Sequence, residues 1–82
     1  MTHPLMQMPE IVFALRGEFI SLDALLKATG MASSGGVAKQ MIMAGMVSVD
    51  RMIERRRSCK IRPRQTVECA GTTVCVIASA LS

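Results

Sequence analysis

Residues 22–49 read LDALLKATGMASSGGVAKQMIMAGMVSV, and this stretch contains two short helix patterns followed by a strand. The first pattern places three leucines at i, i+3 and i+4, the spacing of one helix face: Leu22, Leu25 and Leu26. We expect Ser21 to cap its N-terminus, with Asp23 in the first turn at the positive end of the helix dipole. Gly30 provides the left-handed residue that ends such a helix.

The second helix pattern begins at Ser33 or Ser34, either of which can accept a hydrogen bond from a free helix N–H, and it ends at Gly45. Four apolar residues fall on one side of this pattern: Val37, Ala38, Met41 and Ile42. After Gly45 the apolar period changes from that of a helix to that of a strand. Residues 46–49 therefore predict a strand directly after the helix pair.

The rest of the chain predicts a small sheet around this helix pair. Apolar or alternating runs at 11–15, 66–70 and 73–78 indicate strands. Residues 1–9 contain two prolines and little periodicity, and we interpret them as a flexible N-terminal tail. Residues 10–80 are expected to form one domain, because a chain of 82 residues can bury only one small core. The predicted class is α+β, with two short helices packed on a small, mostly antiparallel sheet.

Two turns are expected within this sheet. Asp50 and Arg51 occupy a two-residue hairpin turn before residues 52–53, although Arg51 is an unusual occupant of a position that can require positive φ. Either Arg51 is strained or the loop is longer than two residues. Gly71 and Thr72 are expected to connect the last two strands.

The basic residues are concentrated in one segment. The formal net charge is +4, and residues 51–64 carry +6, with seven of the ten basic residues and one acid, Glu54. The remainder, with three basic and five acidic residues, carries −2. The seven basic residues are Arg51, Arg55, Arg56, Arg57, Lys60, Arg62 and Arg64. Such a run attracts phosphate, which arginine can bind bidentately, although a basic run can also be only a solvated loop.

A second anion site is predicted at the start of the second helix. The segment Ser33–Gly36 reads Ser-Ser-Gly-Gly, which leaves helix N–H groups accessible and lets a phosphate approach the backbone closely. Lys39 and Gln40 lie one turn further on, on the polar face. The structural alternative is that these serines only cap the helix, as serine often does.

Catalytic, metal and membrane signatures are absent from the sequence. The three cysteines, Cys59, Cys69 and Cys75, include no C-x-x-C pair, and His3 is the only histidine, so we expect structural cysteines and no metal site. No catalytic set or phosphate-binding glycine loop can be assembled, which predicts a protein that is not an enzyme and has no cofactor or small-molecule substrate. No apolar run approaches the length of a membrane span, and no signal peptide opens the chain, so we expect a cytoplasmic protein without membrane association.

The order of these residues resembles the S-four-type RNA-binding domain, also called the αL motif. The resemblance rests on Leu22, Asp23, Leu25, Leu26, Gly30, Ser33, Ser34, Ala38, Lys39, Ile42, Gly45, Val47 and Val49, followed by the basic segment. The lead-in at 13–18 and the Ser-Ser-Gly-Gly entry are similar to the stand-alone bacterial YbcJ-like branch of this family. The resemblance covers roughly residues 11 to 70. It implies the αL fold and binding of structured RNA by the helix pair and the following hairpin.

Carried over position by position, the resemblance implies RNA contacts at Lys27, Ser33, Ser34, Lys39 and Gln40 of the helix pair and at Arg51, Arg55, Arg56 and Arg57, which are expected to lie on a basic hairpin. The later basic residues of the same segment extend the expected surface: Lys60, Arg62 and Arg64. The chain also departs from the family pattern. Ser21 and Gly35 stand where arginine is often found, and the two turns at 49–51 and 63–65 have lost their usual glycines. We therefore expect the binding surface to be shifted toward residues 51–64.

The expected function is docking on folded RNA, such as ribosomal or transfer RNA, with the ribosome as a candidate partner. Phe13 and Phe19 are the only aromatic residues, which disfavours reading of single strands by base stacking. One alternative is a redox or metal-sensing protein that uses the cysteines, which thiol titration with and without zinc would reveal. Another is a protein-interaction module that binds an acidic partner or a membrane surface, which competition by RNA would distinguish from RNA binding.

Overall fold

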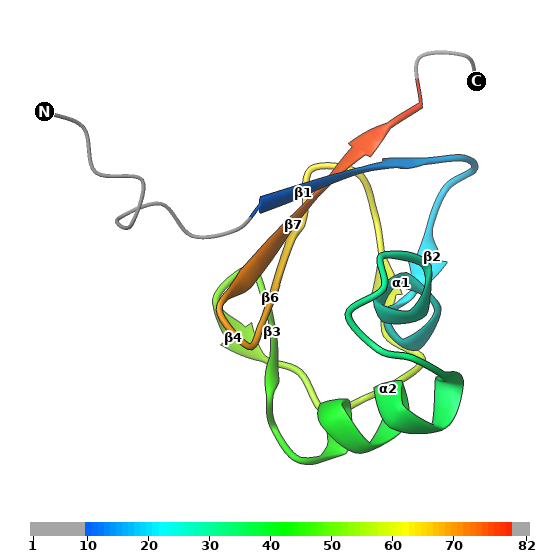
Figure 1. The fold of residues 1–82 in the computed structure, drawn as a ribbon. Coiled ribbons are helices and arrows are strands. Elements are labelled where there is room, and N and C mark those ends of the chain that lie inside the picture. The colour runs from blue at the N-terminus through cyan, green and yellow to red at the C-terminus, as the bar shows by residue number, and fades with distance from the viewer. Residues whose placement is uncertain (1–9, 80–82) are drawn as a thin grey trace, which may run out of the picture.

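The computed structural model describes residues 10–79, and these form two helices and seven strands (Figure 1). In chain order the elements are β1 (Glu10–Leu15), β2 (Ile20–Ser21), α1 (Leu22–Ala28), α2 (Gly35–Met43), β3 (Val47–Val49), β4 (Met52–Ile53), β5 (Lys60–Ile61), β6 (Thr66–Cys69) and β7 (Thr72–Ala78). The predicted tail at 1–9 lies outside the described residues, so its expected flexibility stays a prediction.

The main sheet has five strands in the order β1-β7-β6-β3-β4. Its neighbours are antiparallel except for β1 and β7, which run parallel with Glu10 opposite Thr73 and Leu15 opposite Ala78. A second, two-stranded sheet pairs β2 with β5, which were not predicted as strands. The α+β class and the mostly antiparallel sheet are confirmed, and both helices lie on one side of the main sheet (Figure 1).

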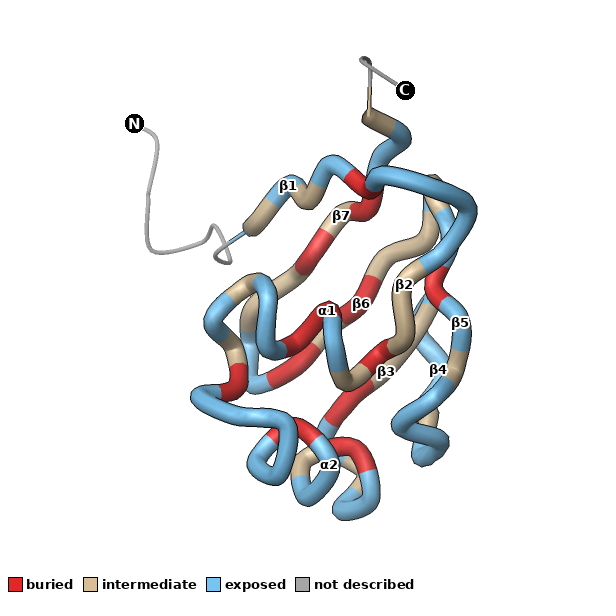
Figure 2. Tube along the Cα trace, turned by 90° about the vertical axis from the view of Figure 1, so that its right-hand side faces the viewer, coloured by how far each residue is buried: buried red, intermediate tan, exposed pale blue. Residues whose placement is uncertain are grey.

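The core lies between the helix pair and the inner face of the sheet. Buried and more exposed residues alternate along β6 and β7, as expected when only one sheet face is covered (Figure 2). Thirteen apolar residues form one buried cluster: Leu15, Leu22, Leu25, Leu26, Ala32, Ala38, Ile42, Val47, Ile61, Val67, Cys69, Val74 and Val76. The predicted apolar side of the second helix is only partly correct, because Ala38 and Ile42 are fully buried whereas Val37 is 38% exposed.

Two hairpin turns are formed by residue pairs with positive φ. Asp50 and Arg51 have φ values of 50° and 71°, and Val49 pairs directly with Met52. The loop therefore has two residues, and Arg51 adopts the left-handed conformation that is costly for a side chain with a Cβ. The other turn is Ala70–Gly71 rather than the predicted Gly71–Thr72, because Cys69 pairs with Thr72 and leaves Ala70 outside the ladder.

The N-terminus of α1 is capped differently from the prediction. Ser21 occupies the N-cap position, but its side chain makes no capping hydrogen bond. The first two helix N–H groups donate instead to backbone carbonyls of a distant segment: Leu22 to Cys59 at 2.8 Å and Asp23 to Arg57 at 3.0 Å. This capping brings the basic segment against the helix pair.

Candidate nucleic-acid interface

The loop Glu54–Cys59, between β4 and β5, contains the three adjacent arginines. These arginines follow the β3–β4 hairpin and belong to no strand. The expectation that they lie on a basic hairpin was therefore wrong, and of the basic residues only Arg51 lies within that hairpin. The loop carbonyls of Arg57 and Cys59 cap α1, so the basic loop is held in place by backbone hydrogen bonds at the start of this helix.

Arg55 lies at the other contact point of this loop, the C-terminus of α2. A Cβ added at Gly45, just beyond the end of the helix, would be 2.8 Å from Nη2 of Arg55, so the guanidinium group packs directly over the glycine. A cation at this position is stabilised by the negative end of the helix dipole. The loop therefore contacts the start of α1 and the end of α2, and the loop and the helix pair form one surface.

Arg56 forms an ion pair with Glu54 within the same loop. Its Nε donates to Oε2 of Glu54 at 2.9 Å, and its backbone N–H donates to the same oxygen at 3.0 Å. Hydrogen bonds from the Arg56 side chain, and then from its backbone, lower the pKa of Glu54 from 4.5 to about 2. Glu54 is therefore ionised at neutral pH and offsets one of the three arginine charges.

Lys60 and Arg62 lie against an aromatic ring. The Lys60 Nζ lies 4.8 Å from the centroid of the Phe19 ring, and the Arg62 Cζ lies 5.8 Å from it, both within cation–π range. Phe19 is 44% exposed. The expectation that the chain has no stacking platform is therefore incomplete, because one partly exposed ring lies between basic side chains.

The predicted anion site at the start of α2 lies at the opposite end of the helix from Arg55. Ser34 is the N-cap, and its Oγ accepts a hydrogen bond from the Val37 N–H at 3.2 Å, whereas Ser33 does not cap the helix. Ser34 and Gly45 lie just outside the two ends of α2 and are eleven residues apart, so at a rise of about 1.5 Å per residue they are separated by about 16 Å. The remaining predicted helix contacts, Lys27, Lys39 and Gln40, are exposed.

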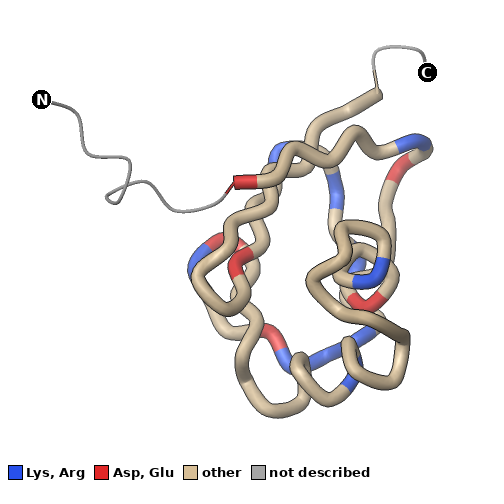
Figure 3. The backbone as a smooth tube through the Cα atoms, viewed as in Figure 1, with Lys and Arg blue, Asp and Glu red and all other residues tan. Residues whose placement is uncertain are grey.

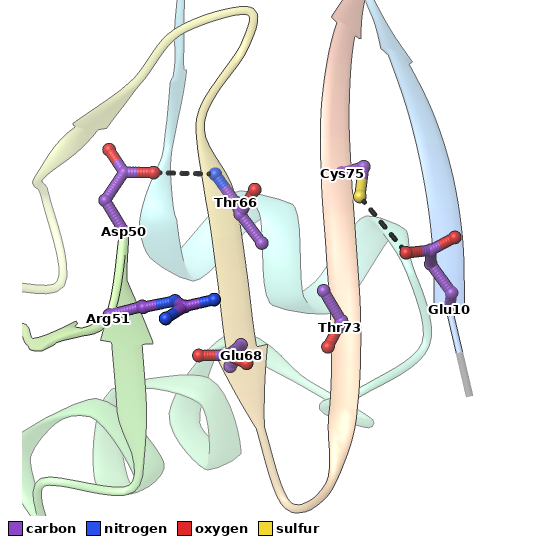
Figure 4. A pocket seen from close by; sticks show the side chains of 7 residues that line it. All are labelled: Glu10, Asp50, Arg51, Thr66, Glu68, Thr73 and Cys75. Carbon is purple, nitrogen blue, oxygen red and sulfur yellow. Dashed lines mark hydrogen bonds between the residues drawn. The ribbon is translucent and has the colours of Figure 1, made fainter. Parts of the chain in front are cut away.

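Arg51 lies among acidic side chains. It lines a pocket of about 430 Å³ on the outer face of the sheet, together with Glu10, Asp50, Thr66, Glu68, Thr73 and Cys75. Figure 4 shows its guanidinium group directed toward Glu68. Three of the lining residues are acidic, which weakens the attraction of Arg51 for phosphate. Arg64 is exposed in a turn, with φ of 78°, that follows Pro63.

Cys59, Cys69 and Cys75 are free thiols in the described part of the chain. Residues 10–79 contain no group of three or more His, Cys, Asp or Glu that could hold a metal ion. Burial is the main cause that raises the pKa of Cys59, Cys69 and Cys75, so these thiols are protonated at neutral pH. No helix in the described part is long and apolar enough to cross a membrane.

Figure 3 shows where the charges lie along the backbone, with basic positions in the loop between β4 and β5 and along the chain beyond it. The sequence identified the run of basic residues, but it did not identify Gly45 as the partner of Arg55 or Phe19 as the partner of Lys60. Gly45 was expected only to end a helix. These contacts join segments that are far apart in the chain, and no local pattern signals them.

The fold and this surface define the class of the protein. Two helices pack on a small mixed sheet, and a basic loop is hydrogen-bonded to the helix pair. A family model of the S4 domain matches residues 13–77, and the chain therefore belongs to the S4 domain family.

Two curated relatives are similar over most of the chain. One is YbcJ of Escherichia coli (strain K12), described as a candidate RNA-binding protein, and the other is an uncharacterized YbcJ protein of Shigella flexneri. Each is 46% identical over 59 residues, which cover 72% of this chain and 84% of the relative. The solution structure of E. coli YbcJ, described as revealing an αL motif involved in RNA binding, matches with a TM-score of 0.64 and 38% identity. That match covers 95% of this chain and 98% of YbcJ, so this chain has the αL-motif fold.

Proposed function

We propose that this protein is a non-enzymatic RNA-binding module of the cytoplasm that docks on structured RNA, ribosomal or transfer RNA being the candidate classes. The observation that carries the proposal is the loop Glu54–Cys59, which contains three arginines and contacts both the start of α1 and the end of α2. The αL motif of E. coli YbcJ, described as involved in RNA binding, supports it. The exposed side chains of Lys27, Lys39 and Gln40 would extend the contact along the helices.

The proposal predicts a preference for folded RNA. Basic groups can contact the phosphates of any RNA, but a fixed surface with only one partly exposed ring favours a rigid backbone over flexible, unstacked bases. We expect transfer RNA or a ribosomal RNA hairpin to bind more tightly than poly-U of the same length in the same buffer, as measured by fluorescence anisotropy. Equal or tighter binding of poly-U would refute docking on structured RNA.

The contact between Arg55 and Gly45 can be tested with two matched glycine variants. Gly45 and Gly30 have φ values of 79° and 81°, so Gly45→Ala and Gly30→Ala should each lose about 1–2 kcal/mol of stability from backbone strain. Only Gly45→Ala displaces the Arg55 guanidinium group, because a Cβ on Gly30 would have nothing within 4 Å. We expect Gly45→Ala alone to lower RNA affinity, by about two- to fivefold, the range of a surface charge interaction. Equal RNA affinities of the two variants would show that the position of Arg55 does not matter.

The pair between Glu54 and Arg56 predicts a gain of affinity on removing the acid. Glu54→Gln removes one negative charge from the loop and releases the Arg56 guanidinium group for phosphate. We expect RNA affinity to rise by about two- to fivefold at constant salt. Glu18→Gln is the matched control, because Glu18 is exposed, lies outside the loop and changes the net charge equally. A loss of affinity in Glu54→Gln would mean that the acid positions Arg56 for binding.

The lowered pKa of Glu54 also predicts a pH dependence. Its folded pKa of about 2 is below the ordinary 4.5, so the carboxylate contributes stability above about pH 4.5 and loses that contribution as the pH falls toward 2. Acid unfolding followed by circular dichroism should therefore show a smaller loss of stability over this window in Glu54→Gln than in the wild type.

A further inference from the structure

Within residues 10–79, one edge of the strand β1 has no paired neighbour. The strand forms one end of the main sheet, and among these residues only β7 pairs with it. With six residues it is much longer than β4, the two-residue strand at the opposite end. Proteins usually protect such edges with lysine, proline, a bulge or a very short strand. Within Glu10–Leu15 there is no lysine or proline, and the only charged residue is Glu10 at the start of the strand, so Ile11–Leu15 has none of these protective residues.

Among the described residues, the backbone groups of β1 that face away from β7 have no strand partner. The Leu15 carbonyl accepts a hydrogen bond from the Ser79 N–H at 2.9 Å, so the backbone groups of Leu15 face the β7 side. Successive residues of a strand direct their N–H and C=O groups to opposite sides, which turns those of Val12 and Ala14 toward the open edge. The Val12 side chain is also 62% exposed, on the sheet face that the helices do not cover.

The side chains along this edge are self-complementary. Exposed and more buried residues alternate from Glu10, at one end, to Arg16, one residue beyond the other end. If two copies pair antiparallel with Phe13 opposite Phe13, Glu10 of each copy lies opposite Arg16 of the other. In the single copy the Glu10 Oε2 accepts a hydrogen bond from the Cys75 Sγ at 3.6 Å, so pairing with Arg16 requires the Glu10 side chain to turn from β7 toward the open edge. Val12 then lies opposite Ala14. These are the two residues whose backbone N–H and C=O groups face the open edge of β1. A register centred on Val12 would instead place Glu10 opposite Ala14 and lose both charge pairs.

We propose that this edge is a self-association site, at which β1 pairs antiparallel with β1 of a second copy of this chain. The resulting dimer has a two-fold axis at Phe13, two Glu10–Arg16 pairs and one sheet that continues through both copies. The loop that follows β4 lies at the other end of the sheet, so it stays accessible in both copies (Figure 1). This inference does not depend on RNA binding.

Charge-reversal variants of the full chain test both the pairing and its register. Glu10→Arg places Arg opposite Arg, and Arg16→Glu places Glu opposite Glu, so each variant alone should raise the dimer dissociation constant at least about tenfold. An equal mixture of the two variants restores opposite charges at both positions and should dimerise again. The double variant Glu10→Arg/Arg16→Glu should dimerise alone. Both residues are exposed, and circular dichroism checks that each variant is folded.

The measurement is sedimentation equilibrium over about 1 μM to 1 mM protein, the range of weak to moderate association. We expect the wild type to shift from monomer to dimer within this range, and each single variant to need at least about tenfold more protein to dimerise unless the two are mixed. A wild type that is monomeric throughout overturns the proposal. A dimer that survives both single variants, or a mixture that does not recover, also overturns it, because the copies would then associate through another surface or register.

Discussion

Replacing Arg55, Arg56 and Arg57 by Ala should weaken RNA binding strongly, and more than Gly45→Ala does. Each neutralised phosphate contributes about −0.9 to the slope of log K against log salt for duplex DNA, and we take a comparable value for RNA. Three arginines would then account for a slope of nearly 3, but Arg56 is paired with Glu54 and contributes less. We therefore expect the triple variant to reduce the slope by about 2 and to lower affinity strongly at low salt.

A charge-matched variant is the control for this result. Changing Lys27, Lys39 and Arg16 to Ala removes the same number of charges from outside the loop. Lys27 and Lys39 are single ammonium groups on the helices, so this variant should lose less affinity and less slope than the arginine triple. Salt titrations of both variants, with folding checked by circular dichroism, decide the matter. If the control variant loses more affinity and more slope than the arginine triple, the helix face is the main binding surface and the loop is not.

Replacing Leu26 by Ala should have the largest effect on stability. The side chain of Leu26, on α1, is fully buried in the core. Leucine-to-alanine changes in cores lower the free energy of unfolding by about 2–5 kcal/mol, which includes the effect of the cavity that remains. A chain of 82 residues is expected to have a total stability of about 4–12 kcal/mol, so this loss is a large fraction of it. Urea unfolding followed by circular dichroism should show a clearly lower midpoint.

The control for the core variant is Met43→Ala at the end of α2. Met43 is 59% exposed, and alanine favours a helix at least as well as methionine, so its unfolding midpoint should stay close to that of the wild type. A Leu26→Ala protein within about 1 kcal/mol of the wild type would mean that the core repacks around the missing side chain. Such repacking requires the methionines that pack against the core, Met31 and Met41, to move into the space.

The sequence by itself determined the local elements of this protein. The spacing of Leu22, Leu25 and Leu26 places all three in the core, and Gly30 and Gly45 follow the helix ends with positive φ, as predicted. The alternation of residues 66–69 likewise predicted β6. These features depend on neighbours within one or two turns of the chain, so their periodicity is visible in the residue order.

Only the tertiary structure decided how the basic loop meets the helices. The sequence predicted that Ser21 would cap α1, but carbonyls of Arg57 and Cys59 reach the same N–H groups and satisfy them. The contact of Arg55 with Gly45 and the ring partner of Lys60 likewise depend on segments far apart in the chain. The parallel pairing of β1 with β7 also joins segments far apart in the chain, and the sequence did not predict it. Backbone donors and charged groups are bound by whichever partner the packed core brings near them, and residue order alone does not specify that partner.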